Sequence, residues 1–436
     1  MRHPAPRPPF RRVHLRAPLL RCSVMIRGLA LDLVASNTDA PSSAVPEPHS
    51  RSPRRRRALR PAIVHQNFML YGGGERFSTL MARELDCKVY SVAVSPDVVR
   101  AHAELQARLV DKSVRTSERA WFLEMLRDHV AMDVDADVIL YSGDIPVFRA
   151  FSDRRTPFAY YCHTPPRFMW GGDLRRDEMA KHEGGARVRW LLYISALWAA
   201  SQTLHRVVVP AEAVMVNSRL VEERYHRLYG RRPGRIVHPP IDFPAYRTGP
   251  FEDWLLTVSR LEGAKRVDVL IRATAAAGQK LVVAGDGPDR ARLERVADEC
   301  GADVEFAGRV SDARLADLYA SCKAFLFAAK NEDFGLVPFE ALASGKPLVA
   351  VDEGGFWELA TERTAWAWRT EADLAALLPK VTPAACRARE AECRAVARRL
   401  DAPRVADEVR EVLRRVAAAP ASRRGAAAPL PGGGAS

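Results

Sequence analysis

The sequence lacks the features of a membrane-spanning protein and of a disulfide-stabilised one. No run of 18 apolar residues occurs among its 436 residues, whereas a transmembrane helix needs about 20. The longest candidate, residues 190–200, has about half of that length. The seven cysteines are an odd number and form no C-x-x-C pair, so a reducing compartment is favoured over a secreted disulfide framework. We therefore expect a cytoplasmic protein.

Acidic residues are scarce in the first part of the chain. Residues 1–60 hold 13 arginines against three acidic residues, so they carry +10 of the formal net charge of +13. This segment is rich in arginine, proline and serine, so it is not expected to form a core. We interpret it as a disordered, dispensable extension, with contact to anionic lipid at the inner face of the membrane as the alternative. Because the rest of the chain is nearly neutral, a nucleic-acid-binding function would rest on the extension alone, and no nucleic-acid partner is expected.

The length exceeds what one hydrophobic core accommodates, so two domains are expected. From residue 61 onward, strand-like and helix-like segments alternate, which is typical of parallel α/β sheets with right-handed crossovers. We predict Rossmann-like domains over residues 61–240 and 241–385. A helix over 386–416 should pack back across the cleft between them, and a disordered tail should follow over 417–436.

The first domain is predicted to open on a strand, a glycine cluster and a helix. Residues 62–68 form the strand, and L-Y-G-G-G-E-R leads into a helix with apolar residues at helical spacing. Glycines at such a turn let the backbone approach a ligand's phosphates. The G-x-G-x-x-G pattern is absent, so a dinucleotide site is not indicated. Further strands are predicted over 87–94, 137–141, 157–162 and 213–218, of which the last closes the first sheet.

His163 is the candidate site residue of this domain. It follows the strand over 157–162, at the end where open α/β sheets bind ligands, and a stiff T-P-P-R turn follows it. Upstream, Asp133 and Asp135 form a D-x-D pair. Such a pair can hold a divalent metal, but here helix capping and strand entry explain it, so we expect no metal. An apolar, arginine-flanked helix over 187–204 should pack in the core or, alternatively, against the other domain or against lipid.

Two glutamates mark the second domain. Glu332 and Glu340 stand eight positions apart in K-N-E-D-F-G-L-V-P-F-E. Glu332 should close a strand-to-helix turn whose following amides form an anion site at a helix N-terminus. Glu340 should lie about 12 Å farther along the helix axis, at 1.5 Å per residue. This spacing suits either a ligand with phosphate between sugar and ribose or an amphipathic helix with two solvated glutamates. The other expected strands cover 254–259, 280–285, 304–307, 323–328 and 347–351.

Four motifs follow one another in the second half of the chain. They are S-R-L-x-x-x-K-R at 259–266, G-D-G-P at 285–288, N-E-D-F-G at 331–335 with its second glutamate, and G-G-x-x-E at 354–358. Together they resemble the retaining glycosyltransferases of family 4, which have the GT-B fold. The Y-Y-C-H-T-P-P-R-F-M-W stretch and V-N-S…H-P-P-I-D resemble a subgroup that includes O-antigen-type mannosyltransferases.

The resemblance implies catalytic roles for four residues. Arg260 and Lys265 match the pair that contacts the donor diphosphate and stabilises the leaving group. Glu332 matches the glutamate that contacts the transferred sugar. His163 matches the histidine near the sugar's reacting face. In such enzymes a phosphate oxygen of the donor takes the acceptor's proton, so neither a metal nor another cofactor is implied.

The remaining implied residues bind the donor. Glu340 matches the glutamate on the ribose hydroxyls, and Gly73 and Gly74 match the loop beside the diphosphate. Gly285 belongs to the G-D-G-P motif, and the amides of Phe334, Gly335 and Leu336 would hold phosphate and sugar hydroxyls.

The implied reaction is transfer of a hexose from a nucleotide sugar to a glycan or lipid-linked acceptor, with retention at the anomeric carbon. GDP-mannose is the leading donor and UDP-glucose or a relative the second. A nucleotide-sugar epimerase is the competing enzyme class, but S-R-L-x-x-x-K and the glutamate pair argue against it.

Overall fold

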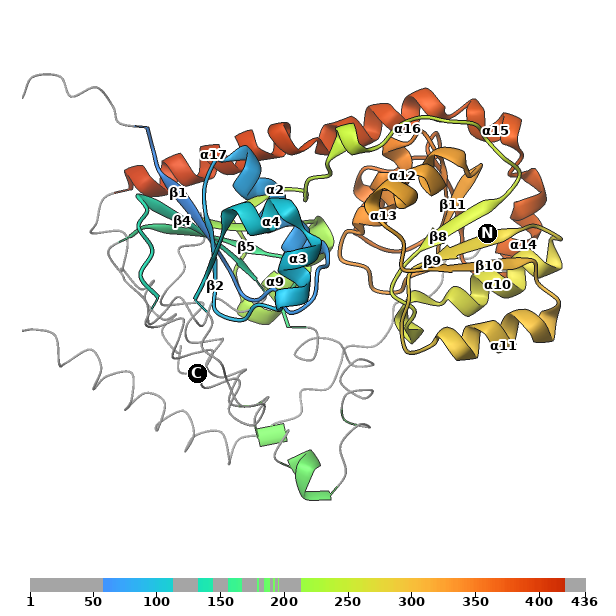
Figure 1. Ribbon diagram of the computed structural model, residues 1–436, viewed down its shortest axis with the longest axis horizontal. Helices are drawn as coiled ribbons and strands as arrows, with labels where there is room; N and C mark the ends of the chain where they lie inside the picture. The colour runs from blue at the N-terminus through green and yellow to red at the C-terminus, as the bar shows by residue number, and fades with distance from the viewer. Residues whose placement is uncertain are drawn as a thin grey trace, which may run out of the picture.

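The computed structural model describes residues 58–112, 132–143, 156–166 and 213–419, together with a few helical positions between 179 and 195. Most of the expected extension over 1–60 and of the expected tail over 417–436 lies outside these residues. Two α/β domains lie side by side, each built on a sheet with helices packed around it (Figure 1). Every strand pair in both sheets is parallel. The prediction of two Rossmann-like domains is confirmed.

The first sheet has the strand order β3-β2-β1-β4-β5-β6-β7. Its strands are β1 (Pro61–His65), β2 (Val89–Ser91), β3 (Leu109–Asp111), β4 (Val138–Gly143), β5 (Phe158–Cys162), β6 (Val214–Val216) and β7 (Arg235–Ile236). The expectation that the strand over 213–218 closes this sheet is wrong. β7 lies outside β6, with Met215 paired to Arg235. A strand of two residues is too short to produce a recognisable apolar pattern in the sequence.

Four of the described helices belong to the first domain. They are α2 (Gly73–Glu84), α3 (Pro96–Ala101), α4 (Ala103–Arg108) and α9 (Arg219–Tyr229). Phe77 and Met81 of α2 are fully buried against Ile63 of β1 and Leu140 of β4. Burying such side chains contributes about 1.5–3 kcal/mol each. This packing fixes the start of α2 beside the end of β1.

The second sheet has the order β10-β9-β8-β11-β12-β13. Its strands are β8 (Leu255–Val258), β9 (Leu281–Ala284), β10 (Val304–Gly308), β11 (Ala324–Phe327), β12 (Leu348–Val351) and β13 (Ala365–Trp368). The principal helices are α10 (Val267–Ala276), α11 (Arg290–Cys300), α12 (Asp312–Ser321), α13 (Leu336–Ala343) and α14 (Glu371–Leu377). Four of its strands, β8, β9, β11 and β12, are buried almost throughout, as expected for strands covered on both faces.

The C-terminal segment is not the single helix expected over 386–416. It consists of α15 (Pro383–Arg387), α16 (Glu390–Ala397), a 3-10 turn and α17 (Ala402–Ala418). The break occurs where the interdomain linker pairs with the chain. The Ile241 N–H donates to Leu400 O at 2.9 Å, and Ala402 N–H donates to Ile241 O at 3.1 Å. Backbone groups used in this way cannot continue the helical ladder.

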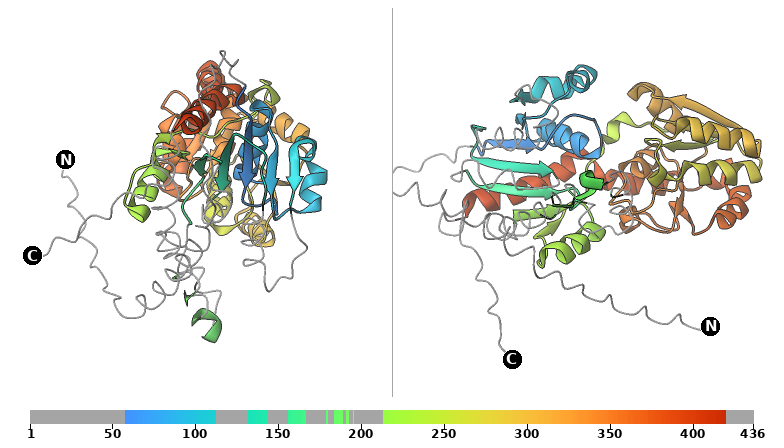
Figure 2. Two further views of the ribbon diagram at one scale, coloured as in Figure 1. Left: turned by 90° about the vertical axis from the view of Figure 1, so that its left-hand side faces the viewer. Right: turned by 90° about the horizontal axis from the view of Figure 1, so that it is seen from below.

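The expected crossing of the C-terminal segment between the domains is nonetheless observed. α16 packs on α13 of the second domain, and α17 packs on α2, β4 and β5 of the first. Val405, Val409 and Leu413 of α17 are buried in the core of the first domain. Figure 2 shows these red helices reaching beside the strands of the first sheet. The first domain therefore completes its core with the end of the chain.

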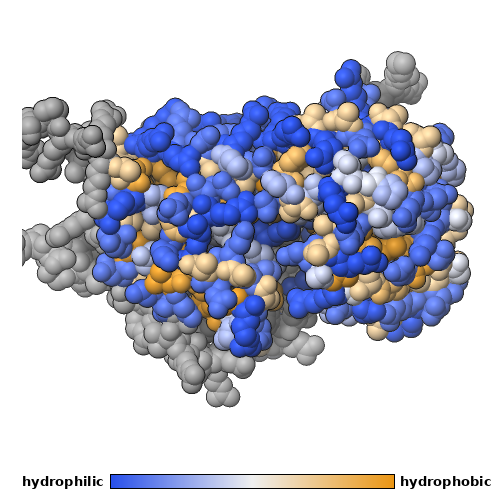
Figure 3. All heavy atoms as spheres, turned by 45° about the horizontal axis from the view of Figure 1, so that its top comes forward, coloured by the Kyte–Doolittle hydropathy of each residue, from blue (hydrophilic) through white to orange (hydrophobic). Residues whose placement is uncertain are grey.

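The described surface is largely hydrophilic on the face shown in Figure 3. None of the described helices is long and apolar enough to cross a bilayer. The helix expected over 187–204 is described at residues 187, 188, 191, 192 and 195 only, and the rest lies outside the described residues. Val188 and Leu192 are 57% and 63% exposed, so these two side chains do not pack in the core as expected.

Candidate functional site

Each sheet reverses its strand order at one point. Loops that carry site residues leave the sheet at that point. In the first sheet the reversal lies between β1 and β4, and in the second between β8 and β11. Ligands of open α/β sheets bind outside the carboxyl ends of the strands at such a point. His65 and Gly143 end β1 and β4, while the S-R-L and N-E-D-F-G loops follow β8 and β11. The fold thus places the predicted motifs at two facing binding positions.

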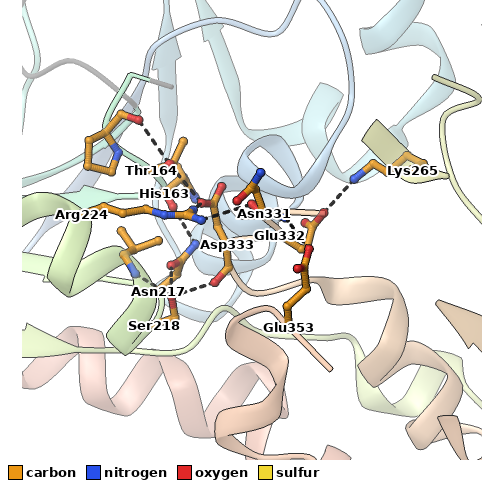
Figure 4. Close-up of polar contacts among 12 residues, drawn as sticks. His163, Thr164, Asn217, Ser218, Arg224, Lys265, Asn331, Glu332, Asp333 and Glu353 are labelled. Carbon is orange, nitrogen blue, oxygen red and sulfur yellow. Dashed lines mark hydrogen bonds and ion pairs between the residues drawn. The ribbon is translucent and has the colours of Figure 1, made fainter. Parts of the chain in front are cut away.

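Lys265 and Glu332 meet at the reversal of the second sheet. Lys265 ends a 3-10 turn over Gly263–Lys265, and its Nζ donates to Glu332 Oε2 at 2.8 Å (Figure 4). Both side chains are about four-fifths buried. A cation and a carboxylate in such a position can interact with opposite charges of one ligand. Arg260 does not join them: its side chain is 58% exposed, and its Nε lies 3.7 Å from Glu262 Oε2.

Glu340 occupies a different environment from Glu332. Its side chain is only 2% exposed and forms an ion pair with Arg76 of α2. The Tyr319 hydroxyl donates to Glu340 Oε2 at 2.9 Å. Burial raises the pKa of Tyr319 well above its usual range, with the Glu340 charge adding to the shift. One carboxylate oxygen therefore faces the first domain and the other is held within the second.

The expected spacing of the two glutamates along one helix axis is wrong. α13 begins only at Leu336, so Glu332 stands outside the helix and Glu340 lies about one turn inside it. The helix begins after Glu332 because Gly335 interrupts the helical conformation. Its φ of 81° is left-handed and would be strained for other residues. A Cβ at Gly335 would also lie 3.3 Å from Glu332 Cγ. Glycine is required here for the turn that leads Glu332 towards Lys265.

Phe334 and the other residues of this turn have packing roles as well. The Phe334 ring is buried between His238, at a centroid distance of 5.0 Å, and Phe339, at 4.8 Å. Leu336 lies at the domain boundary, since a Cβ at Gly73 would be 3.5 Å from its Cδ1. Gly73 and Leu336 therefore bring the first-domain glycine loop and the start of α13 together.

Gly285 explains why the G-D-G-P motif accompanies S-R-L. Its φ is 119°, and a Cβ there would lie 2.0 Å from Ser259 O. The Leu261 N–H also donates to Asp286 O at 3.0 Å. The two loops are thus in direct backbone contact, so Gly285 supports the loop that carries Arg260 and Lys265.

His163 belongs to a hydrogen-bond network within the first domain. Its Nε2 lies 2.8 Å from Ser142 Oγ, which lies 3.1 Å from His65 Nδ1. A Cβ at Gly74 would be 3.4 Å from His163 Nε2. Desolvation, followed by the charge of His65, lowers the pKa of His163 to about 3. His163 is therefore a neutral imidazole beside the glycine loop at neutral pH.

A second set of contacts joins the domains through Asp333. Its carboxylate forms a buried ion pair with Arg224 of α9 and accepts a hydrogen bond from Thr164 Oγ1 at 3.2 Å. The Ser218 hydroxyl, at the N-cap of α9, donates to Asp333 O at 2.8 Å. Figure 4 shows these groups converging from both domains. The residue directly after Glu332 is thus anchored to the first domain.

Sequence reasoning missed several residues of the site. Glu75 and Arg76 end the L-Y-G-G-G-E-R segment. Two charged residues directly after a glycine cluster could have indicated a site here. Arg224 carries no such signal, since it is one of several arginines on a surface helix. Its role appears only once the domains are placed together.

The D-x-D pair has a structural partner. Arg60 contacts Asp135 at 3.1 Å and Asp137 at 3.3 Å, while Asp133 is exposed. Within the described ranges, no group of three or more His, Cys, Asp or Glu side chains is arranged to hold a metal ion.

Lys265, Glu332 and Glu340 all lie in the part of the chain that matches a known family model. Residues 247–377 match the family model described as glycosyl transferases group 1. The matched residues make up most of the second domain. They correspond to the part of the chain in which the four motifs occur, so the resemblance to glycosyltransferases is confirmed at this coarser level.

Curated relatives match part of the chain. D-inositol 3-phosphate glycosyltransferase 2 of Catenulispora acidiphila is 35% identical over 180 residues, which are 34% of this chain and 42% of that protein. D-inositol 3-phosphate glycosyltransferase of Mycobacterium tuberculosis is 33% identical over 173 residues, 34% of this chain and 36% of that protein. The match thus spans about two fifths of the length of these relatives.

Solved structures match more of the chain at lower identity. The crystal structure of HepE from Anabaena in complex with UDP is 18% identical, with a TM-score of 0.64 over 82% of this chain and 100% of that chain. WaaG, a glycosyltransferase involved in lipopolysaccharide biosynthesis, is 17% identical, with a TM-score of 0.56 over 81% and 99%. At these identities the likeness concerns the fold, and it confirms the GT-B architecture.

Proposed function

We propose that this protein is a retaining, metal-independent glycosyltransferase of family 4 that transfers a hexose from a nucleotide sugar to a glycan or lipid-linked acceptor. The observation that carries the proposal is the Lys265–Glu332 pair at the strand-order reversal of the second sheet, within the segment that matches the group 1 family model. The glycine loop of the first domain lies against the start of α13, close to this pair in the chain. A leaving diphosphate, a transferred sugar and an acceptor require groups on both sides of such a site.

The charges suggest how the site would act. Lys265, with Arg260 from the same loop, would stabilise the negative charge that grows on the leaving diphosphate. Glu332 holds the Lys265 ammonium in place and would face the positive charge that develops on the sugar ring. Glu340 would accept hydrogen bonds from the ribose hydroxyls. The acceptor's proton would pass to a phosphate oxygen of the donor, so no side-chain nucleophile is needed.

The donor is proposed in order of preference. The mannosyltransferase-like segments around His163 favour GDP-mannose, and UDP-glucose is the second candidate. HepE was crystallised with UDP-glucose, which supports including uridine donors in any test. We place the reaction in the cytoplasm, with peripheral contact to the inner face of the membrane where a lipid-linked acceptor would lie.

A donor screen tests the proposal. Full-length protein is incubated with GDP-mannose, UDP-glucose and related donors and a pool of lipid-linked acceptors, and the release of GDP or UDP is followed. Lys265→Ala should remove most of the release, whereas Lys280→Ala, on an exposed pair with Glu305, should not. The anomeric configuration of the product, read by NMR, should equal that of the donor. Release of neither nucleotide with any acceptor would contradict the proposal.

A further inference from the structure

A polar pocket of about 220 Å³ lies at the strand-order reversal of the first sheet. Its lining comes from the ends of β1 and β4, the residue after β5, and the first turn of α2. The lining residues are His65, Gln66, Asn67, Gly74, Glu75, Gly143 and His163. The pocket therefore adjoins both the glycine loop and the neutral His163.

Glu75 is the carboxylate of this pocket. It stands in the first turn of α2, where the helix dipole favours negative charge, and its Oε2 accepts a hydrogen bond from Gly72 N–H at 2.9 Å. Its Oε1 lies 3.4 Å from His65 Nε2. Burial alone would raise the pKa of Glu75, but the contacts with His65 and the Gly72 amide outweigh burial and lower it. Glu75 is therefore ionised at neutral pH.

The carboxylate retains hydrogen-bonding capacity towards the pocket. An ionised carboxylate has about four acceptor positions, and Gly72 and His65 use two of them. The side chain is 17% exposed. Gln66 and Asn67 add neutral amide groups to the lining. Such a set of groups suits the hydroxyls of a sugar or cyclitol.

The charge of the pocket argues against a phosphorylated ligand. Arg or Lys side chains normally hold phosphate groups, yet no arginine or lysine is among the described residues that line the pocket. Arg76, next to Glu75 in the chain, is directed to Glu340 of the other domain. A phosphomonoester in this pocket would lie beside the negative charge of Glu75.

We infer that this pocket binds the hydroxyl-bearing end of the acceptor, and that Glu75 selects an uncharged acceptor end over its phosphomonoester. The inference rests on the proposed glycosyltransferase function and adds the substrate class. It also separates this protein from the relatives named D-inositol 3-phosphate glycosyltransferases, whose name specifies a phosphorylated compound.

The test compares two ligands that differ only in the phosphate, myo-inositol and D-inositol 3-phosphate. Ligand-detected NMR titrations give the dissociation constant of each for the full-length protein, with and without saturating UDP or GDP. The wild type should bind myo-inositol about tenfold more tightly, because like charges in a partly buried site repel. Glu75→Gln keeps the shape and should bring the ratio of the two constants close to one. Glu104→Gln, on the neighbouring α4 and about half exposed, should leave the ratio unchanged.

Three results would overturn the inference. These are equal or tighter binding of the phosphate ester by the wild type, a ratio that Glu75→Gln does not change, and binding of neither compound. The proposed function fails separately, if the same protein binds neither UDP nor GDP. In that case the ratio measured without nucleotide still decides whether Glu75 sets the charge preference of the pocket.

Discussion

The Lys265 ammonium contacts the Glu332 carboxylate at 2.8 Å, although 67 positions separate the two residues in the chain. The contact forms because β8 and β11, which precede their loops, are neighbours at the centre of the second sheet. A paired, largely buried lysine keeps its position before a ligand arrives. Its charge is therefore organised in advance for a diphosphate whose negative charge grows during the reaction.

Replacing Lys265 by Ala should lower kcat more than it weakens donor binding. The lost interaction is strongest when the diphosphate departs, so kcat should fall by about tenfold to a hundredfold, the equivalent of one charge-assisted hydrogen bond. Steady-state kinetics with the donor found in the screen measures both constants. An unchanged kcat with a raised KM would show that Lys265 binds the ground state and the transition state equally.

Breaking the Arg224–Asp333 pair should destabilise the protein. Both side chains are more than nine-tenths buried, and removal of one partner from such a pair costs about 3–5 kcal/mol. Arg224→Met should therefore lower the midpoint of thermal and urea unfolding. Arg227→Met is the matched control, because Arg227 lies one turn further along α9 and is 76% exposed. Equal midpoints for the two variants would show that the interdomain pair contributes no net stability.

Much of this arrangement could be predicted from sequence, and the rest depends on contacts between distant segments. The alternation of strands and helices indicated both sheets, and the motifs indicated Lys265 and Glu332 as site residues. The pairing of Arg76 with Glu340 spans 264 positions, and no local pattern encodes it. The helix break before Ala402 likewise depends on the linker residue Ile241. Local periodicity in a sequence indicates how residues close in the chain are arranged. These features depend instead on residues that are distant in the chain and close in space.

The stability of the wild type should fall more steeply on acidification than that of His163→Asn. The pKa of His163 is about 3 in the folded protein, below the ordinary value of 6.5. Between these values the unfolded chain binds the proton and the folded protein does not, so stability rises with pH. The contribution is complete above pH 6.5 and is lost as the pH falls towards 3. The slope should differ by up to about 1.4 kcal/mol per pH unit.

Urea unfolding between pH 7 and pH 4 measures this difference. His226→Asn, at an exposed position of α9, should keep the wild-type slope. A His163→Asn variant with the wild-type slope would mean that the folded protein also protonates His163 in this range.

Turnover should not require a divalent metal. The predicted diphosphate contacts come from Arg260 and Lys265, which would supply the positive charge that a bound ion supplies in other enzymes. Assays with EDTA should therefore retain the activity seen without it. Complete loss in EDTA with recovery on addition of Mg²⁺ or Mn²⁺ would contradict this prediction and would direct attention to Asp133 and Asp135.

Changing Glu332 and Glu340 to glutamine should affect different kinetic constants. Glu340 is expected to hold the ribose, which does not change during the reaction, so Glu340→Gln should mainly raise the KM and Kd of the donor. Loss of a hydrogen bond to a charged group suggests a change of about tenfold to a hundredfold. Glu332 pairs with Lys265 and is expected to face the sugar as it gains positive charge. Glu332→Gln should therefore lower kcat with near-normal nucleotide binding.

Calorimetric titration of the nucleoside diphosphate, together with steady-state kinetics, separates the two cases. Tyr319→Phe is a useful control, since it removes only the hydroxyl that donates to Glu340 Oε2. It should weaken nucleotide binding less than Glu340→Gln does, because the carboxylate and its charge remain. If Glu332→Gln lost nucleotide affinity while Glu340→Gln lost only turnover, the two assignments would be reversed. The buried position of Glu340 beside Arg76 would then serve the chemistry, and the Lys265–Glu332 pair would serve binding.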